Sequence, residues 1–360
     1  MKIYDKVKSI CARWFIDAFS GMAQGLFCTL IAGTILEQIG KWIGNGNFFG
    51  ATLITIAAMA KMLMGAGIGV GIAHALKANK LTMFSAGVAG FVGAFADKLI
   101  AGGVVSVGFG LPGNPIGAYV VSLLTVEIVS LYSGKTKLDI LIVPLGTLIL
   151  TFAGIYLAYP FIELIKLLGL AIEKATAITP FFMGIVIAVV MGVLLTMPTS
   201  SAAIWLSFAS GVTSDSMLLA GGAAVVGCSC HMIGFAVASF RENGISGLIS
   251  QGVGTSMLQI PNIMKKPVIM LPEIIASAIL GPVSTCVFGL KCNAAGGGMG
   301  TSGLVGVFGV IDASASLEPA IMILGIVLLM FVLPAVICYT CSEIFRKIGW
   351  IKEGDQALSK

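Results

Sequence analysis

Ionisable side chains are rare inside the apolar segments of this sequence, and two of them could do chemistry. His231 follows the run Gly227-Cys-Ser-Cys, and nearby glycines leave room beside its imidazole. Glu273 follows Pro272 in LPEIIAS, so a proline interrupts the backbone hydrogen bonds next to a carboxylate. Ionisable groups inside a membrane span are costly and usually have a partner or a function. Free carbonyls and a carboxylate suit a polyhydroxy substrate. The alternative is that these groups pair with each other or with helix ends and only fix the packing.

Glu127, in TVEIVS, is the expected counterpart of Glu273 in the first half of the chain. The remaining charged or imidazole groups in apolar segments have a simpler explanation. Most lie near the ends of their segments, where they can reach the membrane interface, and the long stem of a lysine can carry its ammonium there. These residues are Glu37, Lys61, His74 and Asp97.

Three asparagines lie at breaks in the apolar pattern. They are Asn114 in PGNP, Asn262 in IPNI and Asn293, three residues before a triple glycine. An amide both donates and accepts hydrogen bonds, which suits sugar hydroxyls. It equally suits turns and helix ends. We therefore expect these amides either to bind substrate or to shape the breaks.

Two glycine-rich segments are predicted to be re-entrant hairpins that gate a substrate site. One covers residues 96–115 and includes Gly113 in GFGLPGNP. The other, residues 290–315, contains the consecutive residues Gly296, Gly297 and Gly298. Irregular backbone at membrane depth persists only where protein or a water-filled cavity satisfies it. No Gly-Lys-Ser/Thr follows these glycines and no strand precedes them, so nucleotide binding is excluded.

The composition requires a membrane around these residues. Hydrophobic residues make up 58% of the 360 and charged residues 10%, with a mean hydropathy of +1.04. Soluble domains carry roughly a quarter charged residues. About 20 apolar residues cross a bilayer, which gives about ten spans here. The predicted spans are residues 15–39, 48–76, 81–95, 115–132, 140–159, 178–209, 216–240, 245–258, 268–290 and 320–344. The predicted fold is an all-α integral membrane protein.

The distribution of Lys and Arg predicts the orientation. With the N-terminus inside and an even number of spans, most basic residues collect on one side, so both termini are expected in the cytoplasm. The basic N-terminal segment is predicted to be a first helix that is retained and not cleaved, because no small-residue cleavage site follows it. The net charge of +5 comes from Lys and Arg that lie mostly in loops, so we interpret it as an orientation signal and expect no nucleic-acid partner.

We expect two transmembrane halves, residues 1–160 and 179–345. Residues 161–178 are predicted to form an amphipathic connector on the outer surface, and 346–360 a cytoplasmic tail. The segment IAHALKANKL (72–81) resembles AVASFRENGI (236–245), which suggests a repeat of about five spans per half. An odd number per half would invert the second copy, as in many transporters that bind substrate between their repeats.

Eight cysteines do not indicate a metal site. Most lie in apolar segments, where cysteine behaves as a small hydrophobe. Neither Cys228–His231 nor the pair Cys338 and Cys341 has a second ligand pair at zinc-like spacing. We expect no metal and no cofactor.

Three segments together resemble the IIC-type membrane subunits of the bacterial phosphotransferase system. They are IPNIMKKPVIMLPEIIASAILGPVS, GLKCNAAGGGMGTSGLVG and GFGLPGNPIGAY. The similarity is greatest to the branch that includes the perfringolysin O regulator-like membrane proteins.

This resemblance implies a homodimer in the bacterial cytoplasmic membrane, surrounded by lipid, that carries a sugar inward. A separate IIB subunit with a phosphorylated cysteine would then phosphorylate the sugar, supplied in turn by a IIA subunit. In related proteins a membrane-embedded Glu and His contact the sugar, and Glu273 and His231 are the matching positions. Two alternatives stay open: a membrane-embedded regulator of the same fold, and an ion-coupled transporter of a small organic anion.

Overall fold

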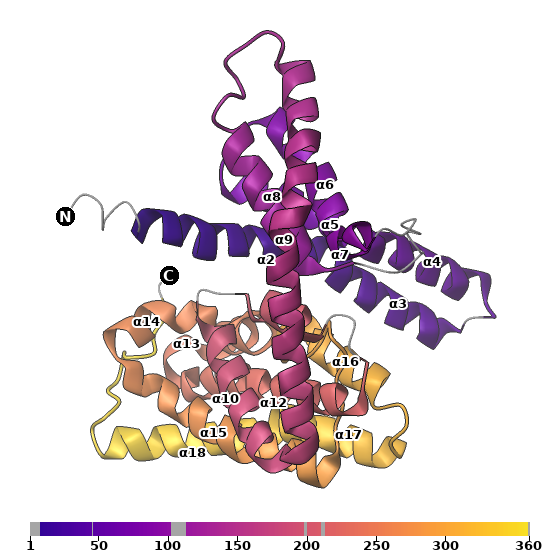
Figure 1. Cartoon of the computed structure of the whole chain (residues 1–360). Helices are drawn as coiled ribbons and strands as arrows, with labels where there is room; N and C mark the ends of the chain where they lie inside the picture. Colours follow the sequence, from indigo (N-terminus) through magenta and orange to yellow (C-terminus); the bar gives the residue numbers. More distant parts are fainter. Residues whose placement is uncertain (1–7, 45, 102–112, 198–199, 210–212, 359–360) are drawn as a thin grey trace. The chain divides into compact units, whose positions relative to one another are not determined.

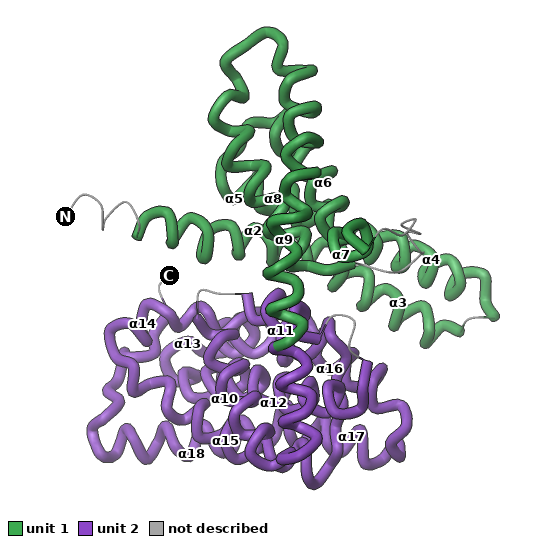
Figure 2. Tube along the Cα trace, in the orientation of Figure 1, with its two compact units in different colours: residues 1–167 green, residues 168–360 purple. Residues whose placement is uncertain are grey.

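The computed structural model describes residues 8–44, 46–101, 113–197, 200–209 and 213–358, and the regular structure in these ranges is helical throughout. Residues 102–112, which form most of the first predicted hairpin, lie outside the described residues. The chain divides into two compact units, Met1–Leu167 and Leu168–Lys360 (Figure 2). The all-α prediction is confirmed.

Unit 1 is built from helices of moderate length that follow one another along the chain (Figure 1). Its elements are η1 (Arg13–Ala18), α2 (Phe19–Leu26), η2 (Phe27–Ile31), α3 (Ala32–Ile43), α4 (Phe48–Met62), α5 (Met64–Ala75), α6 (Lys80–Gly93), α7 (Ala96–Ile100), α8 (Pro115–Val129) and the larger part of α9 (Asp139–Ile178).

Unit 2 surrounds one deeply buried helix, α12, with helices and short irregular turns. Its elements after α9 are α10 (Pro180–Thr196), α11 (Ser201–Ala209), α12 (Asp215–Ala238), α13 (Phe240–Ile249), η3 (Ser250–Gly254), η4 (Ser256–Gln259), α14 (Ile260–Lys265), η5 (Pro267–Met270), α15 (Leu271–Pro282), η6 (Val283–Phe288), η7 (Ser302–Leu304), α16 (Val305–Ala313), α17 (Pro319–Val327), η8 (Leu328–Val332) and α18 (Leu333–Lys347).

Glycine lets these helices approach to backbone contact. In unit 1, a Cβ on Gly25 of α2 would collide with the backbone of Gly67 on α5. In unit 2, a Cβ on Gly227 of α12 would collide with the backbone of Ala188 on α10. Small residues at helix interfaces are the usual means of tight association in membranes, because lipid supplies no hydrophobic driving force between helices.

In the described part of the chain, five helices, some of them composed of consecutive elements, are long and apolar enough to cross a membrane. The pair α4 and α5, bent by 52° at Leu63, raises the number to six. Helices α8 and α10 are apolar but shorter. The number of about ten spans and the inverted repeat therefore stay predictions.

The predicted boundary at residue 160 falls inside a continuous helix. Helix α9 runs for 40 residues and contains both the fifth predicted span and the predicted amphipathic connector. Pro160 lies within it without ending it. The predicted sixth span is instead divided into α10 and α11.

We expect Gly25→Leu to destabilise unit 1, because the added side chain has no space against Gly67. Overpacking of this kind costs about 1–3 kcal/mol. The matched control is Gly46→Leu, since a Cβ there meets no atom within 4 Å. Thermal unfolding in detergent should show a lower midpoint for Gly25→Leu and little change for the control. Equal midpoints for both variants would contradict the packing account.

Candidate functional site

His231 is fully buried in the middle of α12. Its Nδ1 lies 2.9 Å from Oγ1 of Thr196, at the end of α10. The same Thr196 hydroxyl lies 2.9 Å from Oγ of Ser256, the first residue of η4. The ring edge faces Gly192, where a Cβ would come within 2.8 Å of Nε2. Three elements and one glycine therefore fix the imidazole.

The other ring nitrogen, Nε2, is buried and has no hydrogen-bond partner among the described residues. A neutral imidazole carries a proton on one nitrogen and a lone pair on the other. If Nδ1 donates to Thr196, Nε2 accepts; if Nδ1 accepts, Nε2 donates. In either tautomer Nε2 is left without a protein partner among the described residues.

Glu273 lies in the first turn of α15, directly after Pro272, and is fully buried. Its methylene groups pack on α12 at Gly234, where a Cβ would come within 2.8 Å of Cγ, and Cys338 of α18 packs on the same glycine. Neither carboxyl oxygen has a hydrogen-bond partner among the described residues. Burying a carboxyl group without a partner is costly, so this position calls for an explanation.

Helix α12 therefore positions both residues: His231 belongs to α12, and Glu273 of α15 packs against it. No hydrogen bond joins them. His231 faces α10 and η4, whereas Glu273 lies among α12, α15 and α18. The two groups thus do not pair with each other, whereas His231 does pair at a helix end, through Thr196, as the packing alternative expects.

The second glycine-rich run packs against the turns of α12 that carry His231. A Cβ on Gly300 would come within 2.8 Å of the backbone of Cys228, and the Thr301 hydroxyl donates to the carbonyl of Gly252 at 2.5 Å. The run is buried from Gly296 to Thr301. Protein groups thus surround this irregular backbone. Irregular backbone that lies within the membrane, as predicted for this run, needs such surroundings. Whether it gates stays a prediction.

Within the run, the triple glycine lies against α11 and α16. Gly296 packs near Gly309, Gly297 lies on the indole nitrogen of Trp205, and the carbonyl of Gly298 accepts from the Ser201 hydroxyl at 2.7 Å. A side chain at any of these positions would meet another residue.

Asn293 and Asn114 both shape backbone. Asn293 accepts from the Gly296 N–H at 3.0 Å and donates to Asp312 at 3.0 Å. Asn114 caps α8 by accepting from the N–H groups of Ile116 and Gly117. Gly113, before it, has a φ of +76°, which favours glycine.

Asn262, in the short helix α14, bonds protein through its side-chain amide nitrogen. Its amide donates to Gln259 at 2.8 Å and to the carbonyl of Ala357, near the C-terminus, at 2.9 Å. All three predicted amides are thus bonded to this chain.

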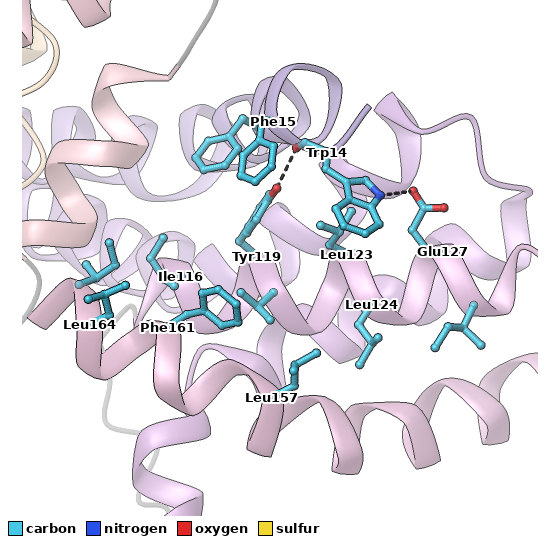
Figure 3. Close-up of a pocket in the computed structure, with 14 residues that line it drawn as sticks. Trp14, Phe15, Ile116, Tyr119, Leu123, Leu124, Glu127, Leu157, Phe161 and Leu164 are labelled. Atoms are coloured by element: carbon cyan, nitrogen blue, oxygen red, sulfur yellow. Dashed lines mark hydrogen bonds between the residues drawn. The ribbon is translucent and has the colours of Figure 1, made fainter. Parts of the chain in front are cut away.

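Glu127 lies in unit 1, at the edge of an apolar cavity of about 550 Å³ (Figure 3). One carboxylate oxygen accepts from Nε of Arg13 at 2.7 Å and from the indole of Trp14 at 3.1 Å. Tyr119 donates to the carbonyl of Trp14 beside it. The other lining residues are hydrocarbon side chains and aromatic rings, which offer a polyhydroxy ligand few hydrogen bonds.

Sequence reasoning missed the partners of these groups. In the sequence, Thr196 and Ser256 are visible only as hydroxyl residues close to a proline or to glycines that interrupt the apolar pattern. The nearby Ser200 hydroxyl caps α11, and the Ser201 hydroxyl donates to the carbonyl of Gly298. Arg13 was counted as an orientation signal.

We expect Thr196→Val to destabilise unit 2 by about 1–3 kcal/mol, because it leaves Nδ1 of His231 buried without a partner. Thr151→Val is the matched control: this buried hydroxyl donates only to the carbonyl of Thr147 in its own helix. Unfolding in detergent with increasing dodecyl sulfate measures both.

In a His231→Ala background, Thr196→Val should cost much less than in the unmodified protein, since the bonded partner is gone. If the cost is the same in both backgrounds, the bond between Thr196 and His231 does not contribute as described.

Neither the curated proteins nor the solved structures include a match to this chain. The family model described as "Phosphotransferase system, EIIC" matches residues 16–358, which is nearly the whole described chain. The chain therefore belongs to the phosphotransferase-system EIIC family and is a multi-pass membrane subunit of the permease type.

Proposed function

We propose that this subunit carries a sugar across the bacterial cytoplasmic membrane and presents it to a separate IIB subunit for phosphorylation. The substrate binds in unit 2, at His231 and Glu273. One observation carries this assignment: Nε2 of His231 and both carboxyl oxygens of Glu273 are buried without partners among the described residues. Buried polar atoms are normally bonded, and a bound ligand would supply the missing bonds.

The chemistry of these atoms fits a sugar. A carboxylate offers two acceptor oxygens, so it can receive hydrogen bonds from two neighbouring hydroxyls. The imidazole nitrogen offers one further donor or acceptor. Thr196 and Ser256 hold the ring for this purpose.

In the proposed reaction the IIB subunit supplies the phosphoryl group from its cysteine. The S–P bond breaks and an O–P bond forms to a sugar hydroxyl, which loses its proton to a base. The membrane subunit binds and orients the sugar and forms no phosphorylated intermediate. We propose that both termini face the cytoplasm, where IIB docks, and that the chain works as a homodimer.

We expect the purified protein to bind at least one sugar in a panel of glucose, mannose, galactose, N-acetylglucosamine and mannitol. Glu273→Gln and His231→Ala should each weaken that binding by about tenfold or more, because each leaves a sugar hydroxyl unpaired. Isothermal titration in detergent measures the affinity.

The matched controls are Glu163→Gln and His74→Ala, which change a partly exposed carboxylate and an exposed imidazole. Both controls should bind like the unmodified protein. Unchanged binding in Glu273→Gln and His231→Ala would overturn the site. Failure of every sugar to bind would favour a regulator. Uptake driven by a proton or sodium gradient without IIB would favour an ion-coupled transporter.

A further inference from the structure

Beyond the last helix, the chain turns back and lies on the short elements after α12. Residues 350–358 make this segment, which we call the C-terminal strap. The N–H of Gly354 donates to Glu242 at 2.9 Å. Asn243 bonds the strap twice, donating to the carbonyl of Gln356 at 2.9 Å and accepting from the N–H of Leu358 at 2.8 Å. These bonds fix its backbone as in a sheet or helix, although it has neither form.

Apolar and ionic contacts anchor the strap. Ile351 is 2% exposed and packs in a cluster with Phe235 and Ile263. Lys266 pairs with Asp355 at 2.5 Å. Burial raises the pKa of Asp355, but the bond from Lys266 and the N–H of Lys352 lower it by more, so the carboxylate stays charged.

From the strap, a chain of buried amides leads inward. The carbonyl of Gln356 accepts from Nε2 of Gln259 at 2.9 Å. The same nitrogen donates to Gln251 at 2.9 Å, and Gln251 donates to the Ser239 hydroxyl at 2.9 Å. All four side chains are fully buried. Polar groups buried in this way are costly without partners, so these bonds hold the amides in place, and Nε2 of Gln356 alone among their amide nitrogens has no partner in the described part of the chain.

Gln259 and Ser256 are the two ends of η4, which connects the strap to the proposed sugar site. Ser256 bonds Thr196, and Thr196 bonds His231. Element η4 is a four-residue 3-10 helix that follows the extended residue Thr255. A helix this short has few bonds of its own, so contacts outside it must determine its position.

We propose that the C-terminal strap is a positioning element for the sugar site: through Gln259 it fixes η4, and η4 holds Thr196 against His231. This role deepens the proposed function and rests on it where sugar binding is concerned. Among the described residues no hydrogen bond or ion pair joins the strap to His231 or Glu273, so the proposed route is through η4 and not directly to the substrate.

The test compares four forms of the chain in detergent. One ends at Gly349 and lacks the strap. Asp355→Lys places two cations together at the anchor. Lys266→Asp combined with Asp355→Lys restores an ion pair with the charges exchanged. The control ends at Leu358 and keeps the whole strap. Circular dichroism and gel filtration establish that each form is folded. If the shortened chain does not fold, the Asp355→Lys variant is used to test the proposal.

Hydrogen exchange of residues 255–260, followed by mass spectrometry, needs no sugar. We expect about tenfold faster exchange without the strap and in Asp355→Lys, with recovery in the exchanged pair and no change in the control. For the panel sugar bound most tightly by the unmodified protein, phosphorylation by IIB should show a KM raised about tenfold and kcat changed less than twofold.

Two results would overturn the proposal: unchanged exchange at 255–260 when the strap is absent, or faster exchange that leaves KM unaltered. Failure of the exchanged pair to recover would also count against it, since the ion pair would then not anchor the strap. If no sugar binds any form, the proposed function fails, and the exchange data alone still decide whether the strap fixes η4.

Discussion

The close approach of α12 to its neighbours is the constraint on which the rest of unit 2 depends. Gly227 lets α10 reach backbone contact, and Gly222 does the same for the chain at Leu290. In a membrane this contact provides dispersion energy that lipid cannot supply between helices. It also encloses α12 almost completely, so every polar group on that helix must find a partner within the protein or in a ligand.

Most polar groups around α12 meet that requirement; among the described residues the exceptions include His231 and Glu273, together with the indole of Trp205 and the hydroxyls of Ser284 and Ser342. Ser229 bonds the carbonyl of Val225 in its own helix, and Ser277 bonds that of Glu273. His231 is satisfied at one nitrogen and Glu273 at neither oxygen. The same packing that stabilises the unit thus isolates these acceptors and donors from water, where hydrogen bonds to a sugar are strongest.

The fold class was predictable because composition and span length depend only on local sequence. His231 and Glu273 could be identified for the same reason: a charge beside glycine or proline in an apolar run is visible without a structure. Their partners could not, since Thr196 and Ser256 come from segments whose pairing is decided by tertiary packing. The asparagines show the opposite problem. Asn114 and Asn293 bond nearby backbone, and a sequence alone does not separate a cap from a ligand-binding amide.

We propose that sugar binds in unit 2 and not in the apolar cavity beside Glu127. Photolabelling distinguishes the two places: a diazirine derivative of the bound panel sugar is crosslinked to the unmodified protein and the labelled peptides are identified by mass spectrometry. We expect label in peptides from α12 and α15, around His231 and Glu273, that excess free sugar abolishes. Competable label confined to α8 or α9, at the cavity of unit 1, would contradict it.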